Sequence, residues 1–187
     1  MKKLLTIVDM QNDFIWKGWA LPIKGAPDLI VPMQNFLTEH GPWFDKALAT
    51  MDTHDEKTYT QSPESKMFDI HCVKGTPGWE LALQPKIPFV THEKGVFDMW
   101  KNPPALDGIK PANWNVFVMG IAADFCVKYA VEGFLERGYN TTVIHDLTKG
   151  INREFIDVAN TDLAQFMKTK QLRLITAAGF ANARKKR

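Results

Sequence analysis

Short, β-branched apolar segments alternate along the chain with segments of helical periodicity, and this alternation constrains the fold more than any other feature. Apolar runs predict strands at residues 3–9, 46–52, 88–92, 115–121, 140–145 and 172–176. Helical spacing predicts helices that begin at Asp28 and that cover residues 124–138 and 152–169. Such alternation is typical of a parallel sheet with helices on both faces. We therefore expect an α/β protein with three α/β/α layers and a mostly parallel six-stranded sheet, in which residues 1–187 form a single domain.

Composition excludes several classes of protein. The net charge of +2 gives no reason to expect nucleic acid as a partner, and we expect the basic residues 184–187 to form a solvated terminus. No apolar run reaches the length of roughly 18 residues that a membrane span needs, so we expect no membrane partner. The two cysteines show no disulfide spacing, which indicates a reducing, cytoplasmic location.

One apolar run leads into a candidate nucleophile. Residues 116–120 end at a small-residue elbow, and Cys126 follows where a helix should begin. The unpaired N–H groups and positive dipole end of a helix favour thiolate over thiol. The amides of the elbow at Ile121 and Ala122, together with that of Cys126, can supply donors for an oxyanion. The segment therefore predicts a nucleophilic cysteine.

Two further residues are predicted to lie beside Cys126. In open parallel sheets, ligands bind beyond the carboxyl ends of the strands. Asp9 ends the first predicted strand and can exchange a proton with the thiol, whereas Lys94 follows the third and can offset negative charge. Each residue alone has an ordinary explanation in packing, capping or solvation, so the catalytic hypothesis depends on their combination. Cys72, in a long loop, is interpreted as structural.

A set of metal-ligand residues accompanies these three. Asp52 and His54 stand two apart at a strand end, where alternate side chains point to one side. Glu64 and His71 follow in the polar segment 53–85, whose length indicates a binding role. Two imidazoles and two carboxylates suit zinc, iron(II) or manganese(II). The alternative is a polar surface loop with scattered histidines.

The motifs around these residues resemble those of the isochorismatase-like cysteine hydrolases and, within them, the nicotinamidases. The resemblance covers residues 4–176 and rests on residues 8–14 (VDMQNDF), 52–54 (DTH), 71–76 (HCVKGT), 93–95 (EKG) and 120–127 (GIAADFCV). It implies a Rossmann-like fold in which Asp9 is the catalytic acid and base, Lys94 the catalytic lysine and Cys126 the nucleophile. It also implies a cis peptide before Ala122, whose amide forms an oxyanion hole with that of Cys126.

The resemblance further implies a metal site and a substrate pocket. One divalent metal ion, with zinc preferred over iron(II) or manganese(II), would be bound by Asp52, His54, Glu64 and His71. Where many nicotinamidases carry another histidine, this chain has Tyr59 and Thr60, so Glu64 is taken as the replacement ligand. Substrate-binding roles are implied for Phe68, which would stack on a pyridine ring, for Phe14 and for Trp19. Residues 95–100 depart from the commoner family pattern.

The implied activity is metal-dependent hydrolysis of nicotinamide to nicotinate and ammonia through a cysteine thioester. The partner would be this small molecule, and a homo-oligomer is left open. A hydrolase of N-carbamoyl or ureido compounds is the alternative, although such relatives usually lack the metal set. A non-catalytic sensor is a third hypothesis, which the three reactive residues disfavour. True isochorismatases are disfavoured because they usually lack the cysteine.

Overall fold

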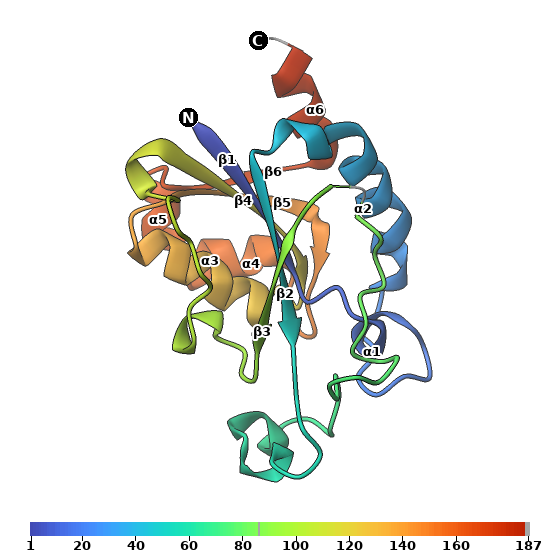
Figure 1. Cartoon of the computed structure of the whole chain (residues 1–187). Helices are drawn as coiled ribbons and strands as arrows, with labels where there is room; N and C mark the ends of the chain where they lie inside the picture. The colour runs from blue at the N-terminus through green and yellow to red at the C-terminus, as the bar shows by residue number, and fades with distance from the viewer. Residues whose placement is uncertain (86, 186–187) are drawn as a thin grey trace.

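Six strands form one sheet in the computed structural model, which describes residues 1–85 and 87–185. The strand order is β3-β2-β1-β4-β5-β6, and all five neighbouring pairs are parallel (Figure 1). The strands are β1 (Lys2–Val8), β2 (Lys46–Asp52), β3 (Val90–Lys94), β4 (Trp114–Ile121), β5 (Asn140–Lys149) and β6 (Leu172–Ile175). The predicted six-stranded parallel sheet is confirmed.

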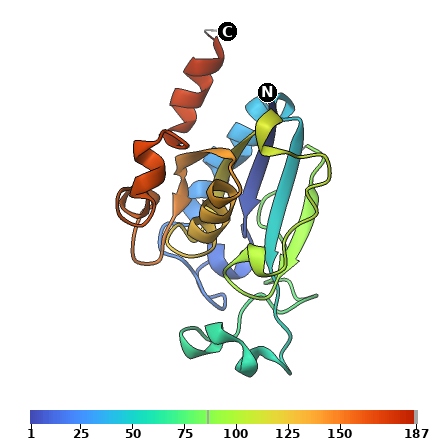
Figure 2. The ribbon, with the colours of Figure 1, turned by 90° about the vertical axis from the view of Figure 1, so that its left-hand side faces the viewer.

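Helices cover both faces of the sheet, as the three-layer prediction required (Figures 1 and 2). On one face lie α2 (Pro27–His40) and α6 (Ala177–Lys185), and on the other lie α3 (Cys126–Glu136), α4 (Phe155–Thr161) and α5 (Ala164–Lys168). The short helix α1 (Asn12–Ile15) follows β1. Among the described residues, the other helical turns are of the 3-10 type: η1 (Gly41–Trp43), η2 (Tyr59–Gln61), η3 (Pro63–Lys66), η4 (Met99–Lys101) and η5 (Pro111–Asn113).

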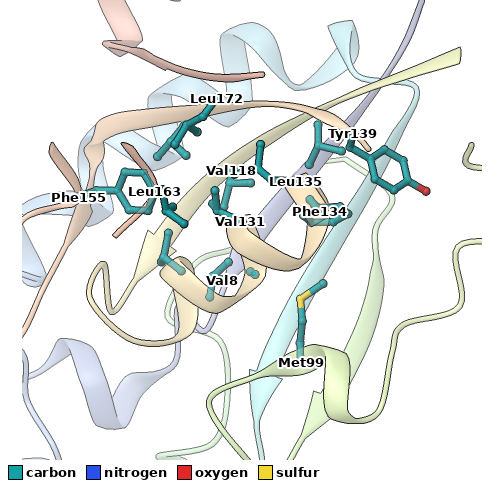
Figure 3. Packing of buried hydrophobic residues seen from close by; sticks show 14 of the residues in the cluster. Val8, Met99, Val118, Val131, Phe134, Leu135, Tyr139, Phe155, Leu163 and Leu172 are labelled. Atoms are coloured by element: carbon teal, nitrogen blue, oxygen red, sulfur yellow. The ribbon is translucent and has the colours of Figure 1, made fainter. Parts of the chain in front are cut away.

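Two hydrophobic clusters hold these layers together. On the α3 face, Val131 and Phe134 pack with Val8 and Val118 (Figure 3). On the opposite face, residues of α2 pack with Leu5 and other strand residues. The central strands read as continuous apolar runs because both of their faces are covered. Burying each large aliphatic or aromatic side chain contributes roughly 1.5–3 kcal/mol, so the clusters fix the sheet that carries the site.

The structure corrects several predicted boundaries. β3 begins at Val90 rather than at residue 88, and Lys94 is its last residue instead of following it. Pro88 has no N–H to donate to a ladder, which explains the later start. β5 extends to Lys149 instead of ending at residue 145, with a register shift opposite β4. The helix predicted over 152–169 is two helices, because the chain breaks at residues 162–163 between α4 and α5.

The C-terminal helix α6 was not predicted. Its first N–H group, that of Ala177, donates to Asp146 Oδ1 at 2.8 Å, and Gly179 N donates to Thr176 Oγ1 at 3.0 Å. The expectation of a solvated basic terminus is wrong for Arg184, whose guanidinium lies 2.7 Å from His40 Nδ1. Residues 186 and 187, part of that expectation, lie outside the described residues.

The chain between β2 and β3 makes a long excursion over residues 53–89, which first extends beyond the carboxyl end of β2 and then returns past α1 and α2 to the start of β3 (Figure 1). Among its described residues, η2 and η3 are the only helical turns, and an isolated bridge joins His54 to Val73. No helix in residues 1–85 and 87–185 is both long and apolar enough to cross a membrane.

Candidate active site and metal centre

The three predicted reactive residues meet at the carboxyl edge of the sheet. Asp9 follows β1, Lys94 ends β3 and Cys126 is the first residue of α3. Lys94 Nζ lies 2.8 Å from Asp9 Oδ2 and 3.4 Å from Cys126 Sγ. All three residues are buried, with exposed fractions of 0%, 3% and 6% for Asp9, Lys94 and Cys126. The sequence prediction that these residues converge therefore agrees with the geometry.

The Asp9 carboxylate is held by strand β2. Asp9 adopts a left-handed backbone conformation with φ of 47°, and its N–H donates to Thr50 O at 3.2 Å. The Thr50 hydroxyl donates to Asp9 Oδ1 at 2.6 Å, which leaves Oδ2 to face Lys94. Thr50 was not identified from the sequence. The available signal was a threonine within a predicted buried strand, two residues before Asp52.

Hydrogen bonds hold the elbow before Cys126 against the chain around residues 149–153. The Ile121–Ala122 peptide is cis, as the resemblance implied. Ala123 N donates to Lys149 O at 2.8 Å, and the Asp124 carboxylate accepts hydrogen bonds from three successive N–H groups, those of residues 151–153. Within the described part of the chain, no acceptor pairs with the N–H of Ala122 or Cys126. These two amides are therefore free to bind an oxygen atom of a ligand.

Burial and neighbouring charges determine the resting protonation of Cys126 and Lys94. Burial raises the pKa of the Cys126 thiol well above its ordinary value, and the Lys94 ammonium opposes this only in part. The expectation that the helix start favours thiolate is therefore wrong for the resting site, where desolvation dominates. Burial lowers the pKa of Lys94, but the carboxylates of Asp52 and Asp9 raise it well above its ordinary value. A protonated thiol thus lies beside a permanent cation and needs a base.

The four predicted metal-ligand residues also meet. Asp52 ends β2, His54 lies on the bridge to Val73, Glu64 belongs to η3 and His71 precedes that bridge. One ligand atom from each lies within 4.8 Å of all the others, and all four residues are buried. The Nε2 atoms of His54 and His71 lie 3.1 and 3.0 Å from Asp52 Oδ2. They lie 3.4 and 3.7 Å from Glu64 Oε2.

The chemistry of this group fits a divalent cation. Neither carboxylate oxygen of Glu64 has a hydrogen bond among the described residues, although the residue is fully buried. A buried carboxylate is costly unless it is paired or binds a metal. His71 Nδ1 donates to Asp69 O at 2.8 Å, which leaves the Nε2 lone pair directed at the group. Two imidazole nitrogens and two carboxylates are a suitable ligand set for zinc and related metals.

Asp52 joins the two groups. Its Oδ1 accepts from Lys94 Nζ at 3.1 Å, while its Oδ2 faces both histidines. Burial alone would raise the pKa of Asp52, but Lys94, followed by the histidines, holds it well below its ordinary value. The ionised carboxylate therefore bridges the ammonium of the trio and the ligand group.

Aromatic rings surround the ligand group. The Phe14 ring centroid lies 5.3 Å from that of His71, and the Phe68 centroid lies 6.4 Å from it. The ring centroid of Phe68 also lies 6.1 Å from that of Phe97 and 5.6 Å from that of Phe125. The sequence did not identify Phe97 and Phe125 as site residues. Phe97 closely follows Lys94, and Phe125 directly precedes Cys126.

Two other aromatic residues differ in their relation to the site. Trp19 is 38% exposed, and among the described residues no ring contact joins it to the cluster of Phe14, Phe68, Phe97 and Phe125. The structure thus does not bring Trp19 to the site. Tyr59 packs instead against the ring of His54 at 4.8 Å, and its hydroxyl donates to Phe68 O at 2.9 Å.

The chain is similar in sequence to curated proteins and in fold to solved structures. The curated nicotinamidase/pyrazinamidase of Mycobacterium tuberculosis is 29% identical over 94% of this chain and 100% of its own length. The nicotinamidase of Saccharomyces cerevisiae is 28% identical over 80% of this chain and 89% of its own. The crystal structure of Pyrococcus horikoshii pyrazinamidase in complex with zinc has the same fold. Its TM-score is 0.72 at 23% identity, covering 94% of this chain and 99% of the other.

A family model settles the relationship. The model of the isochorismatase domain matches residues 3–178, a range that contains the reactive trio and all four candidate metal ligands. The chain therefore belongs to the isochorismatase-domain family.

Proposed function

We propose that this protein is a metal-dependent amidase that hydrolyses nicotinamide to nicotinate and ammonia through a thioester on Cys126. The observation that carries the proposal is the buried group of Asp52, His54, Glu64 and His71 directly beside the trio. The curated relatives named as nicotinamidases support the substrate. Hydrolysis of N-carbamoyl or ureido compounds is not favoured, because the ligand group would have no part in it.

The first half of the reaction forms the thioester. Asp9 accepts the Cys126 proton, and the sulfur attacks the carboxamide carbon to form a C–S bond. The amides of Ala122 and Cys126 donate to the oxyanion that develops, a contribution of roughly 3–4 kcal/mol per donor. Asp9 then returns the proton to the nitrogen, the C–N bond breaks and ammonia leaves. Lys94 stabilises the negative charge that passes between sulfur and carboxylate.

The second half regenerates the thiol. Asp9 accepts a proton from a water molecule, whose oxygen attacks the thioester carbon. The C–S bond breaks, nicotinate forms, and the sulfur leaves as a thiolate that takes the proton back from Asp9. Atoms balance over the cycle, in which one water is consumed and one ammonia is released, and the proton that the new carboxylic acid loses on becoming nicotinate is taken up by ammonia in solution. The high resting pKa of Cys126 makes the base necessary in the first half.

The ligand group has a positioning role in this proposal. A divalent ion held by Asp52, His54, Glu64 and His71 would coordinate the ring nitrogen or a water bound to it, and so orient the carboxamide. Zinc is the preferred ion, with iron(II) and manganese(II) as alternatives. Phe14 and Phe68, which contact His71, would line the ring, whereas Trp19 is left out of the pocket. The protein would act in the cytoplasm on free nicotinamide and return nicotinate for pyridine nucleotide synthesis.

An ammonia-release assay tests the proposal. Purified protein should release ammonia from nicotinamide, lose about 10-fold or more of this activity after exhaustive chelation, and regain it with zinc, iron(II) or manganese(II). Nicotinate should appear in equal amount. Full activity after the metal has been removed would contradict the role of the ligand group. Failure to release ammonia with any of the three metals would contradict the substrate.

A further inference from the structure

Gln11 is a fully buried polar residue close to the site that the reaction above does not use. It lies two residues after Asp9, and its exposed fraction is 0%. Its side-chain Nε2 donates to Asp52 O at 2.8 Å and to Trp79 O at 2.9 Å. Its Oε1 accepts from Asp52 N at 2.7 Å. One amide group thus pairs with both backbone polar groups of Asp52.

This pairing occurs at the point where β2 ends. Asp52 is the last residue of the strand, and beyond it the chain is held on the β3 side, where Thr53 N donates to Lys94 O. A side-chain amide that bonds both the N–H and the C=O of one residue restricts rotation of that residue's backbone. The direction of the Asp52 carboxylate is therefore set from the backbone side by Gln11.

The direction of that carboxylate matters because its two oxygens serve different groups. Oδ1 lies 3.1 Å from Lys94 Nζ, and Oδ2 lies 3.1 and 3.0 Å from the histidine nitrogens. A rotation about the backbone of Asp52 would lengthen at least one of these contacts. The contact with Lys94 and the contact with the ligand group therefore depend on one backbone geometry.

The third hydrogen bond extends the network to the far side of the strand end. Trp79 O accepts from Gln11, and Trp79 Nε1 donates to Thr53 Oγ1 at 2.9 Å. Thr53 N in turn donates to Lys94 O at 2.8 Å. Gln11 thus connects the loop after β1 with the segment around residue 79 and, through Thr53, with the end of β3.

We propose that Gln11 is a positioning residue, which acts through Asp52 to keep the metal-ligand group and Lys94 in register with each other. The inference rests on the proposed function, since it assigns a metal to the group of Asp52, His54, Glu64 and His71. Gln11 need not touch substrate or metal. Its effect reaches both the binding of the ion and the chemistry at Cys126.

The chain offers a matched control. Gln34, on α2, makes the same kind of pair with the backbone of Gln84: its Nε2 donates to Gln84 O at 3.0 Å, and its Oε1 accepts from Gln84 N at 3.3 Å. This pair is exposed and belongs to neither the trio nor the ligand group. Replacing Gln34 removes an amide-to-backbone pair without affecting the site.

The experiment compares Gln11→Met and Gln11→Glu with Gln34→Met and the unchanged protein. Methionine keeps the length of the side chain and removes the hydrogen bonds, whereas glutamate places oxygen atoms against the carbonyls of Asp52 and Trp79. Zinc affinity is measured by competition with a chromophoric chelator. The values of kcat and KM are measured with nicotinamide at saturating zinc, and the melting temperature of the metal-free protein is measured by calorimetry. Both Gln11 variants should bind zinc about 10–100-fold more weakly. Their kcat should fall about 10-fold even at saturating zinc, and Gln34→Met should change neither quantity.

The outcomes separate this inference from the proposed function. If the unchanged protein binds no zinc, iron(II) or manganese(II), both are overturned. If it binds metal and folded Gln11 variants bind equally well with unchanged kcat, only the role of Gln11 is overturned. Loss of the cooperative melting transition in both Gln11 variants would also overturn it, because Gln11 would then serve stability instead of positioning.

Discussion

The reactive trio and the metal-ligand group lie side by side but are built in different ways. Asp9 follows β1 and Cys126 begins α3, and both adjoin the buried hydrophobic clusters, whereas Lys94 is itself buried at the end of the edge strand β3. In the ligand group, only Asp52 belongs to a strand, and the other three residues come from the excursion over 53–89. The core thus fixes the nucleophile, whereas hydrogen bonds within the excursion hold most of the ligand group.

This difference predicts where each group is vulnerable. A change at Cys126 should abolish chemistry and leave the ligand group intact, because the sulfur of Cys126 is hydrogen-bonded to Lys94 and not to a ligand residue. A change in the ligand group should weaken metal binding first and affect chemistry through substrate position. Asp52, which contacts Lys94 as well as both histidines, is the point at which the two effects meet.

The largest effect is expected for Cys126→Ala. Loss of the nucleophile should lower kcat by at least about 10⁴-fold, as the loss of a covalent nucleophile does in other hydrolases. Zinc affinity should stay within about 2-fold of the original. A larger loss of affinity is expected only when a metal ligand or its hydrogen-bond partner is replaced, and Cys126 is neither. Ammonia release and chelator competition measure the two quantities.

Cys72→Ala is the control for Cys126→Ala, since Cys72 is also a buried free thiol but contributes no side-chain hydrogen bond to the trio. It should retain activity. Residual turnover in Cys126→Ala above about 1% of the original would remove the thioester from the mechanism. Loss of zinc in that variant would instead show that the two groups cannot be separated.

The second effect is expected for Glu64→Gln, which tests the group built by the excursion. The amide lacks the charge of the carboxylate, so zinc affinity should fall about 100-fold. KM for nicotinamide should rise at limiting zinc, while kcat at saturating zinc should change less, because the trio is untouched. Titration with zinc during the ammonia assay resolves these changes.

Glu56→Gln provides the matched control for Glu64→Gln, because Glu56 lies in the same excursion but is exposed. It removes the same charge and should leave zinc affinity and both kinetic constants as they were. Equal zinc affinity in the two variants would exclude Glu64 from the ligand group and leave Asp52, His54 and His71 as its members.

The sequence was informative where local pattern and tertiary environment agree. Strands β1, β2 and β4 could be predicted because burial on both faces makes most of their residues apolar, and their ends then located Asp9, Asp52 and Cys126. The edge strand β3 carries exposed and half-buried residues, so its limits were misplaced. The ligands in the excursion were found by motif, since no periodicity exists there.

What the sequence could not supply are contacts between residues far apart in the chain. Thr50 is hydrogen-bonded to Asp9, 41 positions away in the sequence, and Gln11 is hydrogen-bonded to the backbone of Asp52 across the same separation. Helix α6 begins where Asp146 accepts the N–H of Ala177, 31 residues later. The protonated state of Cys126 follows from burial by segments that no local pattern brings together, and desolvation then outweighs the helix dipole.

The smallest effect on activity is expected for Gly120→Ala, which tests how rigid the strand ends beside Asp9 are. Gly120 has φ of +126°, and a Cβ there would lie 2.2 Å from Val8 O, a backbone atom next to Asp9. Overpacking and the strained φ together should lower the free energy of unfolding by about 2 kcal/mol or more. Gly18→Ala is the control: its φ is +88°, but a Cβ would meet nothing within 4 Å, so only the conformational cost of about 1 kcal/mol applies. Denaturant unfolding measures both. Equal destabilisation by the two changes would show that the strand ends yield as readily as the loops, and the contrast between a rigid trio and a loop-built metal centre would not hold.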